Sequence, residues 1–391
     1  SQRGTKEALA PPPSLPSLRE LIHPLPAEEY LARQQKARER MAEAGLDAVL
    51  LMGGSSLLYF TAMNWGRSER LFAAVLPRRG EIAYVCPAFE ASRASELIRF
   101  AKDLRTWEED ESPYRLLRQV LQDQGVRTLG IEETTPYFVT YGLAQEAAGL
   151  AQASADPVTV GCRMIKSARE VALMELAAQA TGRAITAAFR QLREGMTPRQ
   201  LAEAVTAAHA QQGVRPGFVL VAFGPSSAFP HGSRKPQQLR EGDVVLVDTG
   251  CSVEGYQSDV TRTVVFGRPS DRQRQVWETV KKAQEAALRA ARPGLAAAEV
   301  DAAARRLIEQ AGWGPGYKFF PHRLGHGIGL DPHEWPYLVR GNTLPLEPGM
   351  TFSDEPGIYI PGEFGVRLED VMVVTATGAR LLTSHSASIT L

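Results

Sequence analysis

Five side chains in the second half of this chain could bind metal ions. They comprise four carboxylates and one imidazole: Asp248, Asp259, His326, Glu355 and Glu369. Such a hard, oxygen-rich set suits two divalent cations that share bridging carboxylates better than it suits a single tetrahedral zinc ion. Each residue lies in a short segment that reads as a strand or a strand end, where a rigid backbone can hold a ligand in place. The sequence therefore predicts a dinuclear metal centre.

The first two carboxylates lie in a predicted hairpin. Asp248 ends the apolar run 244–247, and Asp259 lies in the returning strand. A lone aspartate at the end of a strand usually forms a turn or a cap. A carboxylate inside a strand, however, is poorly tolerated unless it is paired or binds a ligand. The two residues together favour a binding site over an ordinary turn.

Histidines gather in two short motifs. His322, His326 and His333 lie within the glycine-rich segment 321–336, and His231 follows Pro230, so these motifs hold four of the 7 histidines of the chain. Glycine lets the backbone approach a site closely because it has no side chain. A single histidine is more often a packed or surface residue, but this concentration favours a functional site.

The second half also contains an internal repeat. A glycine turn followed by an amphipathic helix occurs at 195–204 and again at 294–303, and the strand pattern of 239–248 recurs at 346–355. Each copy supplies two acidic residues: Asp248 and Asp259 in the first, Glu355 and Glu369 in the second. Two helix-plus-hairpin halves related by a pseudo-twofold axis would bring all four carboxylates to one centre.

The chain is long enough for two domains. Helix patterns at 28–44 and 89–101 alternate with strand patterns at 47–52, 71–76, 82–86 and 128–131, which predicts a smaller N-terminal α/β domain over 27–160. This region has no cluster of ligands or nucleophiles, so we expect it to support the site and control access to it. Residues 1–26 are rich in proline and read as an extended arm, and 161–391 form the second domain. Capping boxes predict helix starts after Ser167 and Thr197.

Charge and composition exclude several classes of partner. Lys+Arg and Asp+Glu number 44 each, so no net field favours nucleic acid or an anionic membrane. No apolar run approaches the roughly 18 residues that a membrane span requires. The three cysteines lie far apart, which makes the cytoplasm the default location, although an exported periplasmic protein would look the same. Because the chain starts at Ser1 without methionine, we expect that an export signal was cleaved or that the start was replaced.

These motifs resemble those of the pita-bread-fold metallopeptidases, and within that family those of prolidase (Xaa-Pro dipeptidase) and aminopeptidase P. The similar runs are FGPSSAFPHG (223–232), DTGCSVEGYQSDVTRT (248–263), HRLGHGIGLDPHEWP (322–336), EPGMTFSDEPGIY (347–359) and GVRLEDV (365–371). The resemblance covers the whole C-terminal domain, and 27–160 suits the creatinase-like N-terminal domain of the family. It implies an α/β (α+β) protein whose catalytic domain has the pita-bread fold with a pseudo-twofold repeat.

The resemblance also implies roles for individual residues. Asp248 and Asp259 would hold one ion, His326 and Glu355 would complete the other, and Asp259 and Glu369 would bridge them. Mn²⁺ is the expected metal, and Co²⁺ or Zn²⁺ would also fit. The remaining roles are as follows: Glu355 as general base, His231 and His333 beside the scissile carbonyl, His322 near the substrate tail, Arg367 near the metals, and Tyr256 and Thr261 as supports of the hydrogen bonding around Asp259.

The implied substrates are di- or short peptides with proline after the scissile bond, and the implied assembly is a homodimer. Trp335 and Tyr337 are candidate walls of a proline pocket. Some prolidases carry an arginine soon after the His-Glu-aromatic-Pro run, to bind the carboxylate of the dipeptide. Here Arg340 is the candidate, but its register is not the usual one, so both a dipeptidase and an aminopeptidase P stay open. Methionine aminopeptidases fit less well because of the N-terminal domain and the spacing of the last two glutamates. Creatinase-like enzymes and metal-free binding modules fit less well because the ligand set is complete here.

Overall fold

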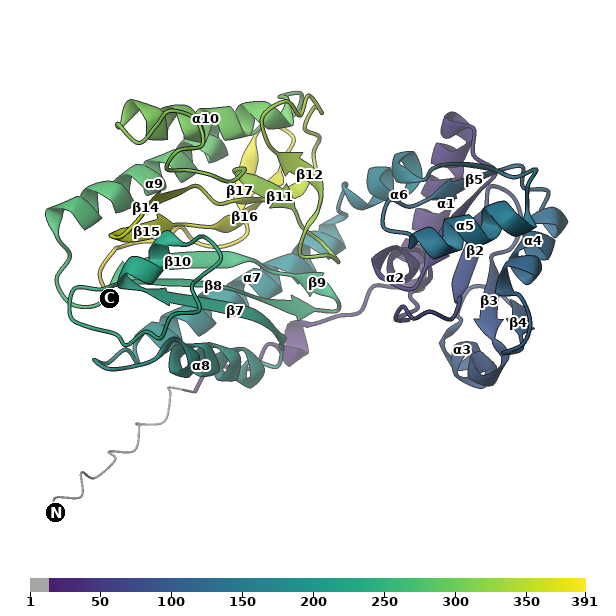
Figure 1. Ribbon diagram of the computed structural model, residues 1–391, viewed down its shortest axis with the longest axis horizontal. Helices are drawn as coiled ribbons and strands as arrows, with labels where there is room; N and C mark the ends of the chain where they lie inside the picture. The colour runs from purple at the N-terminus through teal and green to yellow at the C-terminus, as the bar shows by residue number, and fades with distance from the viewer. Residues whose placement is uncertain (1–13) are drawn as a thin grey trace, which may run out of the picture. The chain divides into compact units, whose positions relative to one another are not determined.

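The computed structural model describes residues 14–391 and divides them into two compact units (Figure 1). One unit comprises residues 25–165, and the other comprises residues 166–391 together with 14–24. Residues 1–13 of the predicted arm lie outside the described part of the chain. The rest of the arm contains one short 3₁₀ turn, η1 (Arg19–Leu21), and the amide of Leu18 donates to the carbonyl of Gln212 at 2.9 Å. This segment therefore packs on the unit that carries the predicted site.

A mixed sheet of six strands forms the centre of the 25–165 unit, in the order β4-β3-β2-β1-β5-β6. The strands are β1 (Ala48–Met52), β2 (Ala73–Pro77), β3 (Ala83–Pro87), β4 (Asp103–Trp107), β5 (Thr128–Ile131) and β6 (Ala151–Ser154). Every residue of β1, β2 and β3 is buried. Strands that are covered on both faces read as continuous apolar runs, which is why these segments were visible in the sequence.

Helices pack against this sheet. They are α1 (Ala27–Ala44), α2 (Ser55–Thr61), η2 (Ala88–Glu90), α3 (Ala91–Leu97), α4 (Pro113–Asp123), α5 (Tyr137–Glu146) and α6 (Asp156–Arg163). The first helix ends at Gly45, whose φ of 70° is in the left-handed region that glycine adopts without strain. The domain boundary expected after residue 160 passes through α6. The whole helix belongs to this unit, and the hydroxyl of Tyr59 donates to the carbonyl of Cys162 at 3.2 Å.

A pair of long helices precedes each of the two strand pairs of the other unit. They are α7 (Ala168–Phe189), α8 (Pro198–Gln211), α9 (Asp271–Ala290) and α10 (Ala297–Gln310). The expected capping boxes are present at Ser167 and at Thr197, where the side chain of each cap accepts a hydrogen bond from the backbone three residues later. Ser270 caps α9 in the same way.

The strands of this unit form two larger sheets and a two-stranded one. The first sheet has the order β10-β8-β7 with β9 on β8, the second has the order β12-β11-β13-β16-β17, and β14 pairs with β15. Their bounds are β7 (Arg215–Phe223), β8 (Val244–Val253), β9 (Tyr256–Gln257), β10 (Val260–Val265), β11 (Gly325–Gly327), β12 (Glu334–Leu338), β13 (Thr351–Asp354), β14 (Gly357–Ile360), β15 (Phe364–Arg367), β16 (Asp370–Val374) and β17 (Ala379–Leu381). A short 3₁₀ helix, η3 (Gly224–Ala228), follows β7.

The two predicted halves are present in this unit. The antiparallel pair β8 and β10 follows α7 and α8, and the antiparallel pair β13 and β16 follows α9 and α10. Figure 1 shows the strands between the two helix pairs. The halves meet where Thr261 and Glu369 form a bridge with two backbone hydrogen bonds, of 3.2 and 3.1 Å. This seam is the place at which the four carboxylates were expected.

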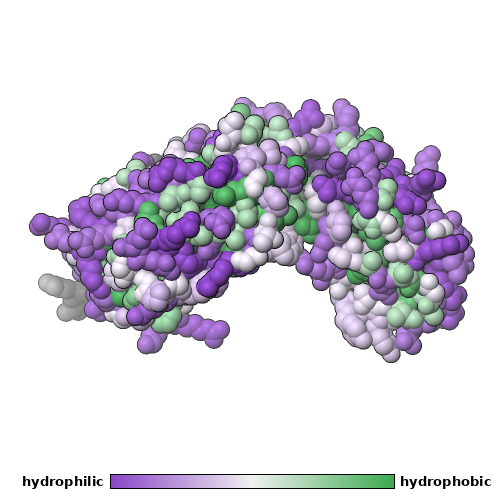
Figure 2. Space-filling view, turned by 90° about the horizontal axis from the view of Figure 1, so that it is seen from above, coloured by the Kyte–Doolittle hydropathy of each residue, from purple (hydrophilic) through white to green (hydrophobic). Residues whose placement is uncertain are grey.

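Hydrophilic residues cover most of the visible face of each unit, and hydrophobic residues appear there in small groups (Figure 2). Among residues 14–391, no helix combines the length and the apolar character needed to cross a membrane.

Candidate active site

Each of the four acidic residues lies in or beside a strand of the central pairs. Asp248 lies inside β8, which continues to Val253, so it does not end its strand as the apolar run had suggested. Asp259 directly precedes β10, Glu369 directly precedes β16, and Glu355 directly follows β13. Equivalent positions in the two halves therefore carry the acids, as the repeat predicted.

Glycines flank His326 because the neighbouring strands leave no room for side chains. A Cβ on Gly325 would lie 1.8 Å from the carbonyl oxygen of Ser353, and one on Gly327 would lie 2.3 Å from that of Trp335. Real Cβ atoms do not approach that closely, so only glycine allows β11 to lie between β12 and β13. This close packing fixes the backbone that carries the imidazole.

The five predicted ligand side chains converge. Nε2 of His326 lies 3.3 Å from Oδ2 of Asp259 and 3.2 Å from Oε1 of Glu355. The side chains form overlapping groups whose ligand atoms lie within 4.8 Å of one another: Asp248, Asp259 and Glu369 in one group and His326, Glu355 and Glu369 in another. A third group combines Asp259 and His326 with His333, which the sequence analysis did not place among the ligands.

Unpartnered oxygens show that a cation fits this cluster. Oδ1 of Asp248, Oδ1 of Asp259 and Oε2 of Glu369 are buried and have no hydrogen-bond partner. A buried carboxylate oxygen without a partner is costly, and a bound cation removes that cost. The donor set and its orphaned atoms therefore suit hard divalent cations.

The hydrogen bonds around His326 fix which nitrogen faces the acids. Its Nδ1 lies 2.9 Å from the carbonyl oxygen of Gly327, so Nδ1 carries a proton, and Nε2 is the nitrogen that faces Asp259 and Glu355. The hydroxyl of Ser353 accepts from the backbone amide of His326 and donates to Oε1 of Glu355, each at 3.0 Å. One serine thus aligns two of the predicted ligands.

Arg367 is buried behind the acids and joins several parts of the site. It donates to Oδ2 of Asp248 at 2.8 Å, to the hydroxyl of Tyr359 at 2.9 Å and to the carbonyl of Pro230 at 3.1 Å. The bond to Pro230 fixes the segment that carries His231, whose own side chain is exposed. The sequence predicted Arg367 near the centre.

Burial and mutual repulsion perturb the acids. Burial, followed by the neighbouring charges of Asp248 and Glu355, raises the pKa of Asp259 well above its usual value. Burial and the charge of Asp259 raise the pKa of Glu369 in the same way. Burial alone would also raise the pKa of Glu355, but the hydrogen bond and positive charge of His326 lower it below its usual value. The cluster carries more negative charge than Arg367 balances, which again favours cations.

Thr261 and Tyr256 support the site from partners other than those expected. The hydroxyl of Thr261 donates to Oε1 of Glu369 at 2.7 Å. The hydroxyl of Tyr256 donates to Oε2 of Glu170, in α7, at 2.6 Å. The hydrogen-bond support that the sequence suggested for Asp259 therefore goes to another ligand and to a helix.

His322 takes part in a hydrogen-bonded chain that sequence reasoning did not foresee. Its Nε2 lies 2.7 Å from the hydroxyl of Tyr359, which also accepts from Arg367 at 2.9 Å. Burial raises the pKa of Tyr359 to about 12, so the phenol stays protonated and can donate to His322. Tyr359 ends the run EPGMTFSDEPGIY (347–359), which also holds Glu355, and this proximity is the signal in the sequence that places Tyr359 near the site.

His333 stacks on His326, with ring centroids 3.6 Å apart. Burial, followed by the charge of His326, lowers the pKa of His333 to about 4, so its imidazole is neutral at physiological pH. The guanidinium of Arg323 adjoins it, with Nη2 3.4 Å from Nδ1 of His333. Arg323 belongs to the run HRLGHGIGLDPHEWP (322–336), but its position in the sequence alone did not indicate this contact.

The predicted pocket aromatics lie together. Trp335 and Tyr337 make an edge-to-face contact at 4.6 Å, and the guanidinium carbon of Arg323 lies 4.3 Å from the Tyr337 ring centre. Arg340 is exposed after the end of β12 and lies over Tyr317 at 4.7 Å. Its role as the carboxylate clamp stays a prediction.

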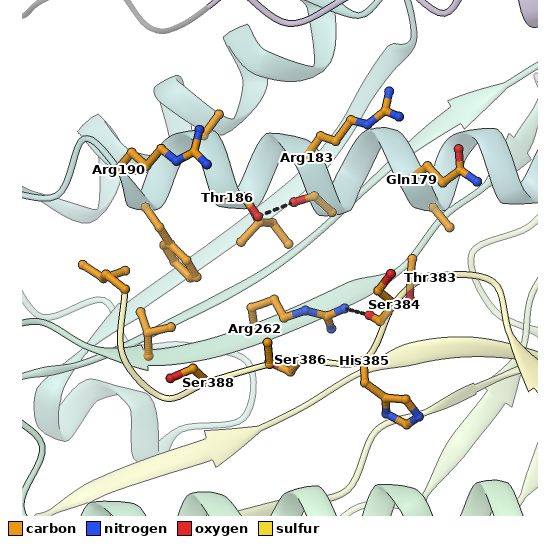
Figure 3. A pocket seen from close by; sticks show the side chains of 18 of the residues that line it. Gln179, Arg183, Thr186, Arg190, Arg262, Thr383, Ser384, His385, Ser386 and Ser388 are labelled. Atoms are coloured by element: carbon orange, nitrogen blue, oxygen red, sulfur yellow. Dashed lines mark hydrogen bonds between the residues drawn. The ribbon is translucent and has the colours of Figure 1, made fainter.

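A cavity of about 1000 Å³ lies elsewhere in this unit, between α7 and the C-terminal segment 381–391 (Figure 3). None of the predicted site residues lines it. Figure 3 shows Arg262 extending along it toward Ser384, whose carbonyl accepts from Arg262 at 3.0 Å. The same guanidinium donates to Oδ1 of Asp370 at 2.7 Å and to the carbonyl of Glu369 at 2.9 Å. Arg262 therefore lines this cavity and also contacts the backbone of Glu369, one of the predicted ligands.

Comparison with known proteins agrees with this geometry. The metallopeptidase family M24 matches residues 172–376, and the creatinase/prolidase N-terminal domain matches 33–165. A probable dipeptidase, PepE, of Mycobacterium tuberculosis is 38% identical over 357 residues, covering 90% of this chain and 94% of that protein. An Xaa-Pro dipeptidase of Pyrococcus horikoshii is 33% identical over 351 residues, covering 89% and 96%. The crystal structure of a prolidase from Thermococcus sibiricus superposes with a TM-score of 0.84 at 33% identity, covering 92% of this chain and 98% of that one.

These matches also confirm the expected fold class, a creatinase-like α/β domain followed by a pita-bread domain. The chain therefore belongs to the metallopeptidase family M24, in its branch of prolidases and aminopeptidases P.

Proposed function

We propose that this protein is a two-metal Xaa-Pro dipeptidase that hydrolyses the peptide bond before a C-terminal proline. The observation that carries the proposal is the convergence of five ligand side chains at the seam of the two halves, with three of their oxygens buried and unpartnered. The relatives named Xaa-Pro dipeptidase and prolidase support the substrate class. Family membership implies divalent metal ions, and the oxygen-rich set favours Mn²⁺ over Co²⁺ or Zn²⁺.

In this proposal five residues hold the metals: Asp248, Asp259, His326, Glu355 and Glu369. The chemistry that bound ions supply here is a water acidic enough to act as a nucleophile near neutral pH. Glu355 would be the residue that accepts a proton from such a water, because its carboxylate lies among the metal ligands, with Oε1 3.2 Å from Nε2 of His326. Arg367 holds Asp248 in place and offsets part of the negative charge.

The histidines orient the substrate. A neutral imidazole with an N–H can donate to the carbonyl oxygen of the scissile bond, and the lowered pKa of His333 keeps it in that state. His231 approaches from the opposite motif, held by the bond between Arg367 and Pro230. His322 receives its hydrogen bond from Tyr359, so its imidazole has a fixed orientation near the substrate tail.

Proline explains why such an enzyme is needed. An Xaa-Pro bond has no amide hydrogen and its ring fixes φ, so peptidases that recognise that N–H cannot bind it. Trp335 and Tyr337 offer an aromatic wall for the pyrrolidine ring. The same chemistry on longer peptides would make the enzyme an aminopeptidase P, which is the alternative that the resemblance leaves open. We also expect a homodimer, which sedimentation or light scattering would test.

The test compares Ala-Pro with the tetrapeptide Ala-Pro-Ala-Ala, using protein stripped of metal and reloaded with Mn²⁺. We expect turnover of Ala-Pro that disappears on exhaustive chelation and returns with the metal. Faster cleavage of the tetrapeptide would make the protein an aminopeptidase P. Activity that survives chelation, with no metal found by elemental analysis, would refute the two-metal mechanism.

A further inference from the structure

Arg323 has an unusual position among the arginines near the site. It follows His322, and its guanidinium lies over the ring of Tyr337 at 4.3 Å, with Nη2 3.4 Å from Nδ1 of His333. Its side chain is partly exposed, so solutes can reach it. The cation therefore lies beside the histidine that we assign to the scissile carbonyl.

The guanidinium of Arg323 is not committed to a carboxylate of the protein. Within residues 14–391, it forms no ion pair with any acidic side chain, and its one side-chain hydrogen bond is the long contact to His333. Two other arginines nearby are fully engaged: Arg367 with Asp248, and Arg305 with Asp301, at 2.9 and 3.0 Å, and with backbone carbonyls. Arg323 thus keeps free donors at the edge of the site, where a guanidinium can bind a carboxylate through two parallel hydrogen bonds.

The ring of Tyr337 explains why this guanidinium can serve. A guanidinium that stacks on an aromatic face is held in one plane, and its N–H groups point outward from the edge of the ring. Tyr337 comes directly after the His-Glu-Trp-Pro run that carries His333. Arg323 comes from the segment before β11 and brings a guanidinium over that position from the neighbouring chain segment.

We propose that Arg323, and not Arg340, binds the free C-terminal carboxylate of the Xaa-Pro dipeptide and so selects dipeptides over longer chains. The inference rests on the proposed dipeptidase function. In an Xaa-Pro dipeptide the carboxylate lies one residue beyond the scissile carbonyl, a step of about 3.8 Å along the chain. A cation that adjoins His333 is within that reach. A longer peptide presents a neutral amide there, which forms weaker hydrogen bonds with a guanidinium than a carboxylate does.

The experiment measures kcat and KM for Ala-Pro and for its amide, Ala-Pro-NH₂, with Mn²⁺-loaded protein. The variants are Arg323→Gln, Arg323→Lys and Arg340→Gln, and the exposed Arg199→Gln in α8 is the matched control. We expect Arg323→Gln to raise KM for Ala-Pro about 10- to 100-fold, the loss of one charge-assisted bidentate contact. The amide should change less than about two-fold, and Arg323→Lys should fall between, because lysine keeps the charge but loses the fork. Circular dichroism and thermal unfolding would establish that each variant is folded.

Other outcomes overturn the proposal in distinguishable ways. If Arg323→Gln lowers kcat equally for both substrates, Arg323 only positions His333, and the clamp is refuted. If the selective loss appears in Arg340→Gln instead, the clamp is Arg340. Unchanged kinetics in Arg323→Gln also refute the role. Wild-type protein that cleaves neither substrate refutes the proposed dipeptidase function, and this inference with it.

Discussion

Replacing Arg367 with alanine should destabilise the protein strongly when metal is absent and less when metal is bound. The substitution removes hydrogen bonds to Asp248, Tyr359 and the carbonyl of Pro230, and it leaves the Asp248 carboxylate without its positive partner. Breaking a buried ion pair by removing one partner costs about 3–5 kcal/mol. Bound divalent cations neutralise the same carboxylate, so part of this loss should disappear in the loaded protein.

The assay is thermal unfolding of wild-type protein and Arg367→Ala, each stripped of metal and each saturated with Mn²⁺. For a unit of this size, about 1 kcal/mol shifts the melting temperature by about 2–4 °C, so we expect a fall of about 6–20 °C in the stripped protein. The two units can unfold separately, so only the transition that responds to Mn²⁺ is compared. Arg199→Ala is the control, since its ion pair with Glu203 is exposed and should contribute little. An equal fall with and without metal, or a fall below about 3 °C, would refute the reasoning.

Three further predictions concern other parts of the fold. Burial lowers the pKa of His209 to about 4, below its unfolded value of about 6.5. The free energy of unfolding should therefore be highest above pH 6.5 and fall by up to roughly 3 kcal/mol as the pH drops toward 4. In urea unfolding, His209→Gln should lack this pH dependence. Gly325→Ala should displace β11, because its Cβ would lie 1.8 Å from the Ser353 carbonyl, and Mn²⁺ titration should then show weaker binding. Lys166→Met should lower the free energy of unfolding by about 3–5 kcal/mol because it breaks the buried ion pair between Lys166 and Glu334, whose charged atoms lie 2.9 Å apart. If the double variant with Glu334→Leu unfolds no later than the single one, this reading fails.

The sequence was sufficient to predict that the five candidate ligands lie together because the chemistry is local to each motif. A carboxylate beside a buried strand is rare enough to be informative, and the repeat indicated that Asp248 and Asp259 have counterparts in Glu355 and Glu369. The helix starts at Ser167 and Thr197 could be predicted for the same reason, because a capping residue and its partner are only three residues apart in the sequence. Each of these features depends on few neighbours, so tertiary packing had little opportunity to change it.

Side-chain partners across the fold were harder to predict. The stacking of Arg323 on Tyr337 depends on β11 pairing with β12, and its register shifts between His326 and Gly327. No spacing in the sequence encodes such an irregularity, so Arg340 was the candidate for the clamp that the sequence offered. The extent of β8 beyond Asp248 likewise follows from its pairing with β7 and β9, which a pattern of apolar residues cannot reveal.

The position of the acids at the seam also explains why the halves depend on each other. Arg262, in the first half, donates to Asp370 and to the carbonyl of Glu369 in the second half. Arg367, in the second half, donates to Asp248 in the first half. Each half thus supplies the cation that offsets acids of the other. Removing either arginine from the intact protein would leave a buried carboxylate of the other half without that cation, a state that costs several kcal/mol for each charge. The charges of the two halves are therefore balanced across the seam, which links the stability of each half to its contact with the other.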